Sequence, residues 1–117
     1  MKKSNQQITA LIGYLNIAAE EYNTDLWRDL AKRLGKSSRR WASVNIDKIA
    51  KHLNTGEIAL VPGKVLGDGI ATGIKVAAIN FSAQARKKIE SAGGICYSIR
   101  DLVEQHADGK NIRIIGG

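Results

Sequence analysis

A glycine-rich segment is the first place where the sequence could support chemistry on a nucleotide. Gly67, Gly69 and Gly73 follow the spacing G-x-G-x-x-x-G, a variant of the dinucleotide-binding fingerprint. That fingerprint must open a helix, because the helix N-terminus faces the pyrophosphate. Residues 74–79 instead have the strand-like sequence IKVAAI. We therefore interpret residues 67–73 as a loop or hairpin and predict that the protein uses no cofactor.

Other groups that could act in catalysis or bind a metal are few. One cysteine, Cys96, and two histidines, His52 and His106, do not have the spacing of metal ligands. Cys96 lies in an apolar segment, where a thiol most often acts as a small buried hydrophobe. No serine lies in a recognisable nucleophile motif. We predict a protein that is not an enzyme, with no metal site and no small-molecule substrate.

The positive charge of the chain is concentrated in one region. The chain has a net charge of +7, and residues 28–51 contain eight basic and two acidic residues, a surplus of six positive charges. Arg28, Lys32 and Lys36 recur every four residues, and only Asp29 is placed to pair with a neighbouring arginine. Because like charges repel, this ridge has no evident stabilising role. It indicates a polyanionic partner.

Composition and hydropathy restrict the class of protein further. The 117 residues suit one domain, and 44% apolar with 25% charged residues is typical of a globular chain. No apolar run is long enough to span a membrane. Polar residues interrupt the apolar stretch 8–19, which favours an amphipathic helix over a secretory signal. With a single cysteine, the chain is expected to be soluble and cytoplasmic.

Hydrophobic periodicity, caps and glycine stops predict the elements that position these residues. Helices are expected at 5–22, 25–34, near 46–53, 82–91 and 98–106. Strands are expected at 57–61, 64–66, 74–81, 95–97 and 112–115, with 44–46 a strand or a helix entry. We expect a turn at Pro62-Gly63 and an exposed loop or helix start at 36–41. Gly13 within the first helix predicts a neighbour packed closely against it.

The order of these elements predicts the fold class. A strand, a serine cap, a short helix and a glycine stop occur in succession after Phe81 and again after Tyr97. This order is typical of βαβ units, so we expect at least two parallel strands. The predicted fold is α/β (mixed α+β) in a single domain, 1–117. Its helical basic region, 1–42, precedes a core with a small mixed sheet and short crossover helices, 43–117.

The residues from 64 to 93 also resemble the signature of a known family. The segments 64–69, 74–81, 82–85 and 89–93 together resemble the C-terminal signature of a ribosomal superfamily. This superfamily comprises the bacterial fifteenth large-subunit ribosomal protein and its archaeal and eukaryotic relative, numbered eighteen-e. The stretch 44–49, Arg39-Arg40-Trp41 and the short C-terminus are similar to the archaeal eighteen-e branch.

This resemblance implies a structural protein of the large ribosomal subunit in the cytoplasm, with irregular β-β-α turns. Its implied partners are large-subunit ribosomal RNA and neighbouring ribosomal proteins. The alternatives are an independent RNA- or DNA-binding module and a small nucleotide-dependent enzyme. The residues expected to contact phosphate are Arg28, Lys32, Arg33, Lys36, Arg39 and Arg40, with Lys64 of second rank.

Several neighbours of these cations complete the predicted RNA-binding set. Trp41 would either stack on a base or pack beneath the basic segment. Ser37 and Ser38 would donate hydrogen bonds. Lys2 and Lys3 form a smaller basic group near the N-terminus.

Overall fold

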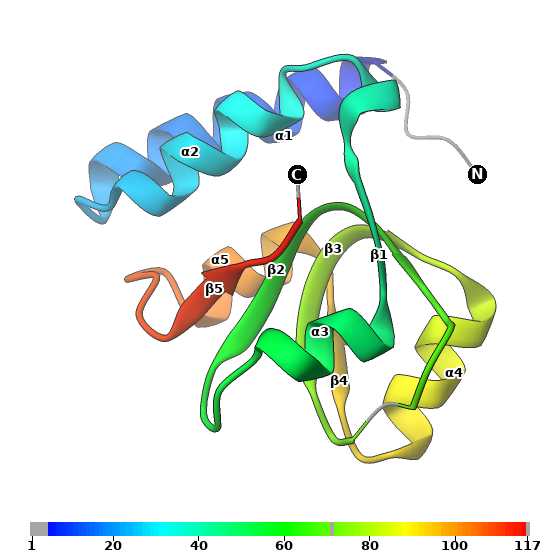
Figure 1. Cartoon of the computed structure of the whole chain (residues 1–117). Helices are drawn as coiled ribbons and strands as arrows, with labels where there is room; N and C mark the ends of the chain where they lie inside the picture. Colours follow the sequence, from blue (N-terminus) through cyan, green and yellow to red (C-terminus); the bar gives the residue numbers. More distant parts are fainter. Residues whose placement is uncertain (1–4, 71, 117) are drawn as a thin grey trace.

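The computed structural model describes residues 5–70 and 72–116, and its elements form one α/β unit (Figure 1). The helical N-terminal region and the mixed core agree with the prediction. Ser4, Lys2 and Lys3 lie outside the described residues. In chain order the elements are α1 Asn5–Glu21, α2 Asp25–Leu34, η1 Ser38–Arg40 (a 3-10 turn), β1 Ala42–Asn45, α3 Ile46–His52, β2 Ile58–Leu66, β3 Lys75–Phe81, α4 Ala83–Ser91, β4 Ile95–Tyr97, α5 Ile99–Gln105 and β5 Ile112–Ile114.

Helices cover both faces of the sheet, giving three layers. Successive strand residues point to opposite faces, so Leu60 and Ile79 pack with α1, α2 and α5. Val61 and Ala78 pack with α3 and α4 on the other face. Figure 1 shows α3 and α4 in front of the sheet and α5 behind it. Burial on both faces explains why residues 58–61 of β2 and 76–79 of β3 are continuously apolar rather than alternating.

The sheet is parallel in every described pairing, which differs from the expected mixed sheet. The strand order is β1-β2-β3-β4, and β5 also pairs with β2. Parallel neighbours require the chain to return to the same end of the sheet. The connection between β2 and β3 makes this return, and Lys88 Nζ donates to the carbonyl oxygens of Gly67 (2.7 Å) and Gly69 (3.0 Å) in its described part. The glycine-rich segment is therefore a loop, as predicted, and not a hairpin.

The predicted turn at Pro62-Gly63 is wrong, because β2 runs through it as one strand. The pairing with β3 shifts register between Val61 and Lys64, so the two residues form a bulge. A proline is tolerated there because a bulge needs no ladder hydrogen bond from it. Gly63 is needed because a Cβ at this position would overlap the carbonyl oxygen of Ala42. The bulge therefore depends on close contact between the backbones of β1 and β2.

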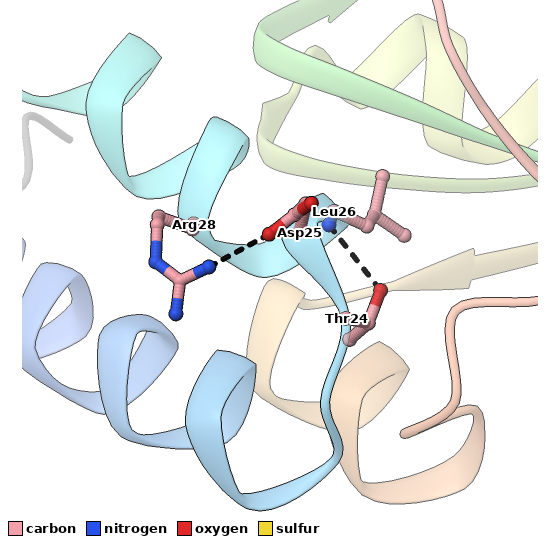
Figure 2. Close-up of polar contacts among 4 residues, drawn as sticks. All are labelled: Thr24, Asp25, Leu26 and Arg28. Carbon is pink, nitrogen blue, oxygen red and sulfur yellow. Dashed lines mark hydrogen bonds and ion pairs between the residues drawn. The ribbon is translucent and has the colours of Figure 1, made fainter.

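The α1–α2 hairpin packs on the sheet through an apolar stripe, as the spacing predicts. Thr24 caps α2 by accepting a hydrogen bond from the amide of Leu26 at 3.3 Å (Figure 2). Trp27 is fully buried and its Nε1 donates to the carbonyl oxygen of Ala107 at 2.8 Å. The expectation of a close neighbour at Gly13 is wrong, since a Cβ there would meet nothing within 4 Å.

The two glycines predict opposite effects of the same substitution. Gly63→Ala should lower the free energy of unfolding by about 1–3 kcal/mol, because the new methyl group forces β1 and β2 apart. Gly13→Ala should raise it by roughly 0.5–1 kcal/mol, because alanine favours an exposed helix interior. Urea unfolding monitored by circular dichroism measures both. A Gly63→Ala variant as stable as the parent would contradict the bulge.

Cys96 gives a chemical prediction about the sheet. Its side chain is partly buried in β4 against the core shared with α3 and α4, and burial raises the pKa of the thiol. Because the thiolate is the reactive form, Cys96 should react with iodoacetamide at pH 8 several-fold more slowly than a cysteine in a short peptide. Unfolding in urea should abolish the difference. Equal rates in the folded protein would contradict the burial.

Candidate nucleic-acid interface

The basic segment after α2 forms a hydrogen-bonded turn. The amide of Arg40 donates to the carbonyl oxygen of Ser37 (2.8 Å), and that of Trp41 donates to Ser38 (3.2 Å). The hydroxyl oxygen of Ser37 accepts from the amide of Arg39 at 3.4 Å. We call residues 36–40 the basic turn; all five are exposed. It therefore presents its three cationic side chains to solvent from a defined backbone.

A cavity of about 620 Å³ lies beside the basic turn. Its walls come from α1, the basic turn, β1 and the bulge of β2, and β3 contributes Asn80. Gly63 of the bulge is among the lining residues, so the backbone contact that the bulge requires also shapes the cavity. The structure thus brings together six residues of the predicted RNA-binding set: Lys36, Ser37, Ser38, Arg39, Trp41 and Lys64.

A polar row that the sequence analysis missed crosses the sheet beneath this cavity. Ser43 of β1 is the register partner of Lys64 in β2, and Lys64 is the partner of Asn80 in β3. All three line the cavity. The only signal in the sequence is one polar residue, Asn80, which follows an apolar run near the end of its strand. Without the register, nothing connects Asn80 with Ser43 or Lys64.

Trp41 lies between the cavity and the core. Its side chain is partly buried and packs against the apolar cluster of α1, α2 and α5. Its indole Nε1 is buried and has no hydrogen-bond partner in the described structure. Buried N–H groups are nearly always paired, so an unpaired one is unfavourable. The packing role expected for Trp41 is present, while stacking on a base remains a prediction.

Two cations of α2, Arg28 and Arg33, differ from those of the basic turn in having acidic partners. Arg28 pairs with Asp25 at 2.7 Å (Figure 2), and Arg33 pairs with Asp29 at 3.3 Å. The sequence analysis foresaw only the second pair. Exposed pairs of this kind contribute only about 0.3–0.5 kcal/mol, but they partly neutralise the ridge. Within the described chain, no acidic partner is found for Lys32 or for the cations of the basic turn.

The predicted contact residues therefore fall into two groups. Arg28 and Lys32 line a second hollow of about 460 Å³ between α1 and α2, together with Asp25 and Asp29. Arg33 lines neither hollow, and Arg40 is exposed on the basic turn. The first cavity has no acidic residue among its described lining, whereas the second has two. The first is thus the better place for an anionic ligand.

No alternative chemistry emerges from the remaining polar residues. The part of the chain described here contains no group of three or more His, Cys, Asp and Glu side chains that could hold a metal ion. His106 packs edge-on against Tyr97, with ring centroids 5.9 Å apart. Within the same residues, no helix combines the length and apolar character that crossing a membrane would need.

Comparison with known proteins gives a consistent result over nearly the whole chain. Residues 2–117 match the family model described as ribosomal protein 60S L18 and 50S L18e. Similar curated relatives are named large ribosomal subunit protein eL18. The one from Methanopyrus kandleri is 48% identical, covering 96% of this chain and 93% of the relative. The one from Archaeoglobus fulgidus is 40% identical, covering 98% and 99%.

A third relative of the same name, from Methanospirillum hungatei, is 42% identical over 97% of this chain and 94% of its own length. These names describe ribosomal proteins and no enzyme, in agreement with the prediction from the residues. The family resemblance predicted from residues 64–93 is confirmed. The chain belongs to the family of ribosomal proteins 60S L18 and 50S L18e.

Proposed function

We propose that this chain is a structural constituent of the large ribosomal subunit and that it binds large-subunit ribosomal RNA through the basic turn. The family membership supports the first part, since the relatives are named as large-subunit proteins. The observation that carries the second part is electrostatic. Lys36, Arg39 and Arg40 are exposed on one short turn without acidic partners in the described structure.

The proposed mechanism is neutralisation of phosphates on a folded RNA. Each phosphate neutralised by a lysine or arginine releases condensed counterions, which makes affinity strongly dependent on salt. The planar guanidinium groups of Arg39 and Arg40 suit bidentate contact with phosphate oxygens. Phosphate contacts fix orientation but carry no sequence information, so recognition would depend on the shape of the RNA.

The cations of α2 and β2 extend this surface. Lys32 lies one helical turn before Lys36, and Lys64 is exposed on the floor of the cavity. Arg28 and Arg33 would have to exchange a carboxylate for a phosphate, so we rank them below the basic turn. Lys2 and Lys3 stay in the proposed contact set on sequence grounds alone.

The proposal includes contacts with neighbouring ribosomal proteins. Ile17 on α1 and Ile70 in the loop after β2 are 67% and 80% exposed, which supports apolar contacts with other chains. No catalytic step is part of the proposal. In the cell, the chain would reside in the cytoplasm as part of the ribosome.

Removing two charges from the basic turn tests its role in RNA binding. Arg39→Ala combined with Arg40→Ala should weaken binding to large-subunit ribosomal RNA and lower the slope of log affinity against log salt by about one to two. Filter binding at several potassium chloride concentrations measures the slope. The melting temperature should be unchanged, because both side chains are exposed.

The matched control removes two exposed lysines elsewhere, Lys87 on α4 and Lys110 before β5. Replacing both lysines by alanine gives the same net charge as the double arginine variant. It should change the slope of log affinity against log salt less. Equal effects of the two variants would mean that binding depends on net charge and not on the basic turn. Co-sedimentation with large subunits at low salt, lost at high salt, tests the ribosomal assignment itself.

The ion pair between Asp25 and Arg28 gives another test of RNA binding. Asp25→Asn releases Arg28 and raises the net charge by one, so RNA affinity at low salt should rise a few-fold. Stability should change little, since the carboxylate side chain is 96% exposed. Asp101→Asn on α5 is the charge-matched control. A rise of the same size in both variants would exclude a contact specific to Arg28.

A further inference from the structure

We propose that the cavity beside the basic turn binds a single unstacked nucleotide of the RNA, with the base inside and its flanking phosphates at the rim. This inference rests on the proposed function and adds a specific subsite to it. The cavity volume of about 620 Å³ lies in the range of small-ligand sites, about 300–1,000 Å³. It is too small for an RNA helix, whereas the splayed bases of loops and bulges enter protein pockets of this kind.

The lining suits the edge of a base. Ser43 and Asn80 contribute a hydroxyl and an amide from the two ends of the polar row, on either side of Lys64, and neither side chain bonds another described residue. An amide offers a donor and an acceptor together, the combination that base edges require. Ile8 and Ile12 of α1 supply an apolar wall for the face of the ring. Polar and apolar groups are thus arranged as a planar heterocycle needs.

Trp41 provides an independent reason to expect a ligand. Its indole N–H is buried without an acceptor, although the side chain lines the cavity. In the proposed complex, a bound base would supply the acceptor that this N–H lacks. Occupation of the cavity would thereby remove an unfavourable unpaired group.

The charges at the rim favour a phosphorylated ligand. Lys36, Arg39 and Lys64 line the cavity, and its described lining contains no carboxylate. These cations lie on two elements, the basic turn and β2, so phosphates on either side of the base would each meet one. This arrangement favours a nucleotide within an RNA strand over a free mononucleotide, which carries phosphate on one side only.

The experiment uses the full chain labelled with ¹⁵N and follows the indole N–H resonances of Trp27 and Trp41. Trp41→Phe assigns the two signals. The probes are inorganic phosphate, the four nucleoside 5′-monophosphates, and unpaired RNA tetranucleotides. We expect the tetranucleotides to shift the Trp41 signal and to leave the Trp27 signal unchanged, since Trp27 is buried and bonded to Ala107.

The other probes identify what the cavity recognises. Inorganic phosphate should shift amides of residues 36–40 but not the Trp41 indole. Mononucleotides should shift the indole only at concentrations at least tenfold higher than the tetranucleotides. An unmoved Trp41 signal, an equal response to inorganic phosphate, or equal affinity for mononucleotides would each overturn the proposal.

A variant that fills the cavity tests the nucleotide subsite separately from RNA binding by the basic turn. Ser43→Phe occupies the cavity from an exposed position of β1 without changing charge, and Ser43→Ala is the matched control. Ser43→Phe should lower affinity for large-subunit RNA about tenfold at an unchanged salt slope, the loss expected when one stacked base is excluded. Asn80→Ala gives a second route to the same test if Ser43→Phe proves unstable.

The outcomes remain distinguishable. If Ser43→Phe and Asn80→Ala bind RNA as the parent does while loss of Arg39 and Arg40 lowers the salt slope, the cavity proposal fails and the proposed function stands. If the arginine variant also keeps the parental slope, the basic turn is not the RNA-binding surface.

Discussion

The close approach of β1 and β2 at Gly63 is the constraint on which the interface depends. Two strands pair with the same edge of β2: β5 pairs near its start, and β1 pairs from Gly63 of the bulge onward. The bulge at Pro62-Gly63 changes the register so that Lys64 pairs with Asn80, and it brings Gly63 against the backbone of Ala42. Because β1 follows the basic turn directly, the same contact fixes where the cations stand relative to the sheet.

The arginines of α2 and the cations of the basic turn differ in whether acidic side chains lie beside them. On α2, where regular helix geometry sets neighbours three and four residues apart, Arg28 and Arg33 have acidic partners. In the basic turn the backbone bonds to itself through Ser37 and Ser38, so its geometry needs no ion pair. Its cations are therefore available to an external anion. The helix pairs lessen repulsion beside this surface, which lets a small domain tolerate a net charge of +7.

Local signals in the sequence predicted most helices and strands. Contacts between residues far apart in the sequence could not be predicted. Caps such as Thr24 and the stripe of α2 are local, and so the helix bounds agree closely with the structure. Pro62-Gly63 has the composition of a turn, and only its pairing with β1 and β3 makes it a bulge. The basic turn could be predicted as a surface from charge alone. The cavity could not, because Ser43, Lys64 and Asn80 meet only through the strand register.

In the proposed complex, the exposed cations and the cavity beside them would contribute to RNA recognition in different ways. Cations on the basic turn would act through counterion release, which depends on salt and is the same whichever nucleotide carries the phosphate. A cavity lined by an amide, several hydroxyls and an indole would act through shape and short-range bonds, which salt screens little. A ligand engaging both must be anionic and must present an unpaired base at a fixed distance from its phosphates. A folded RNA with a splayed nucleotide meets both conditions, whereas a regular duplex meets only the first.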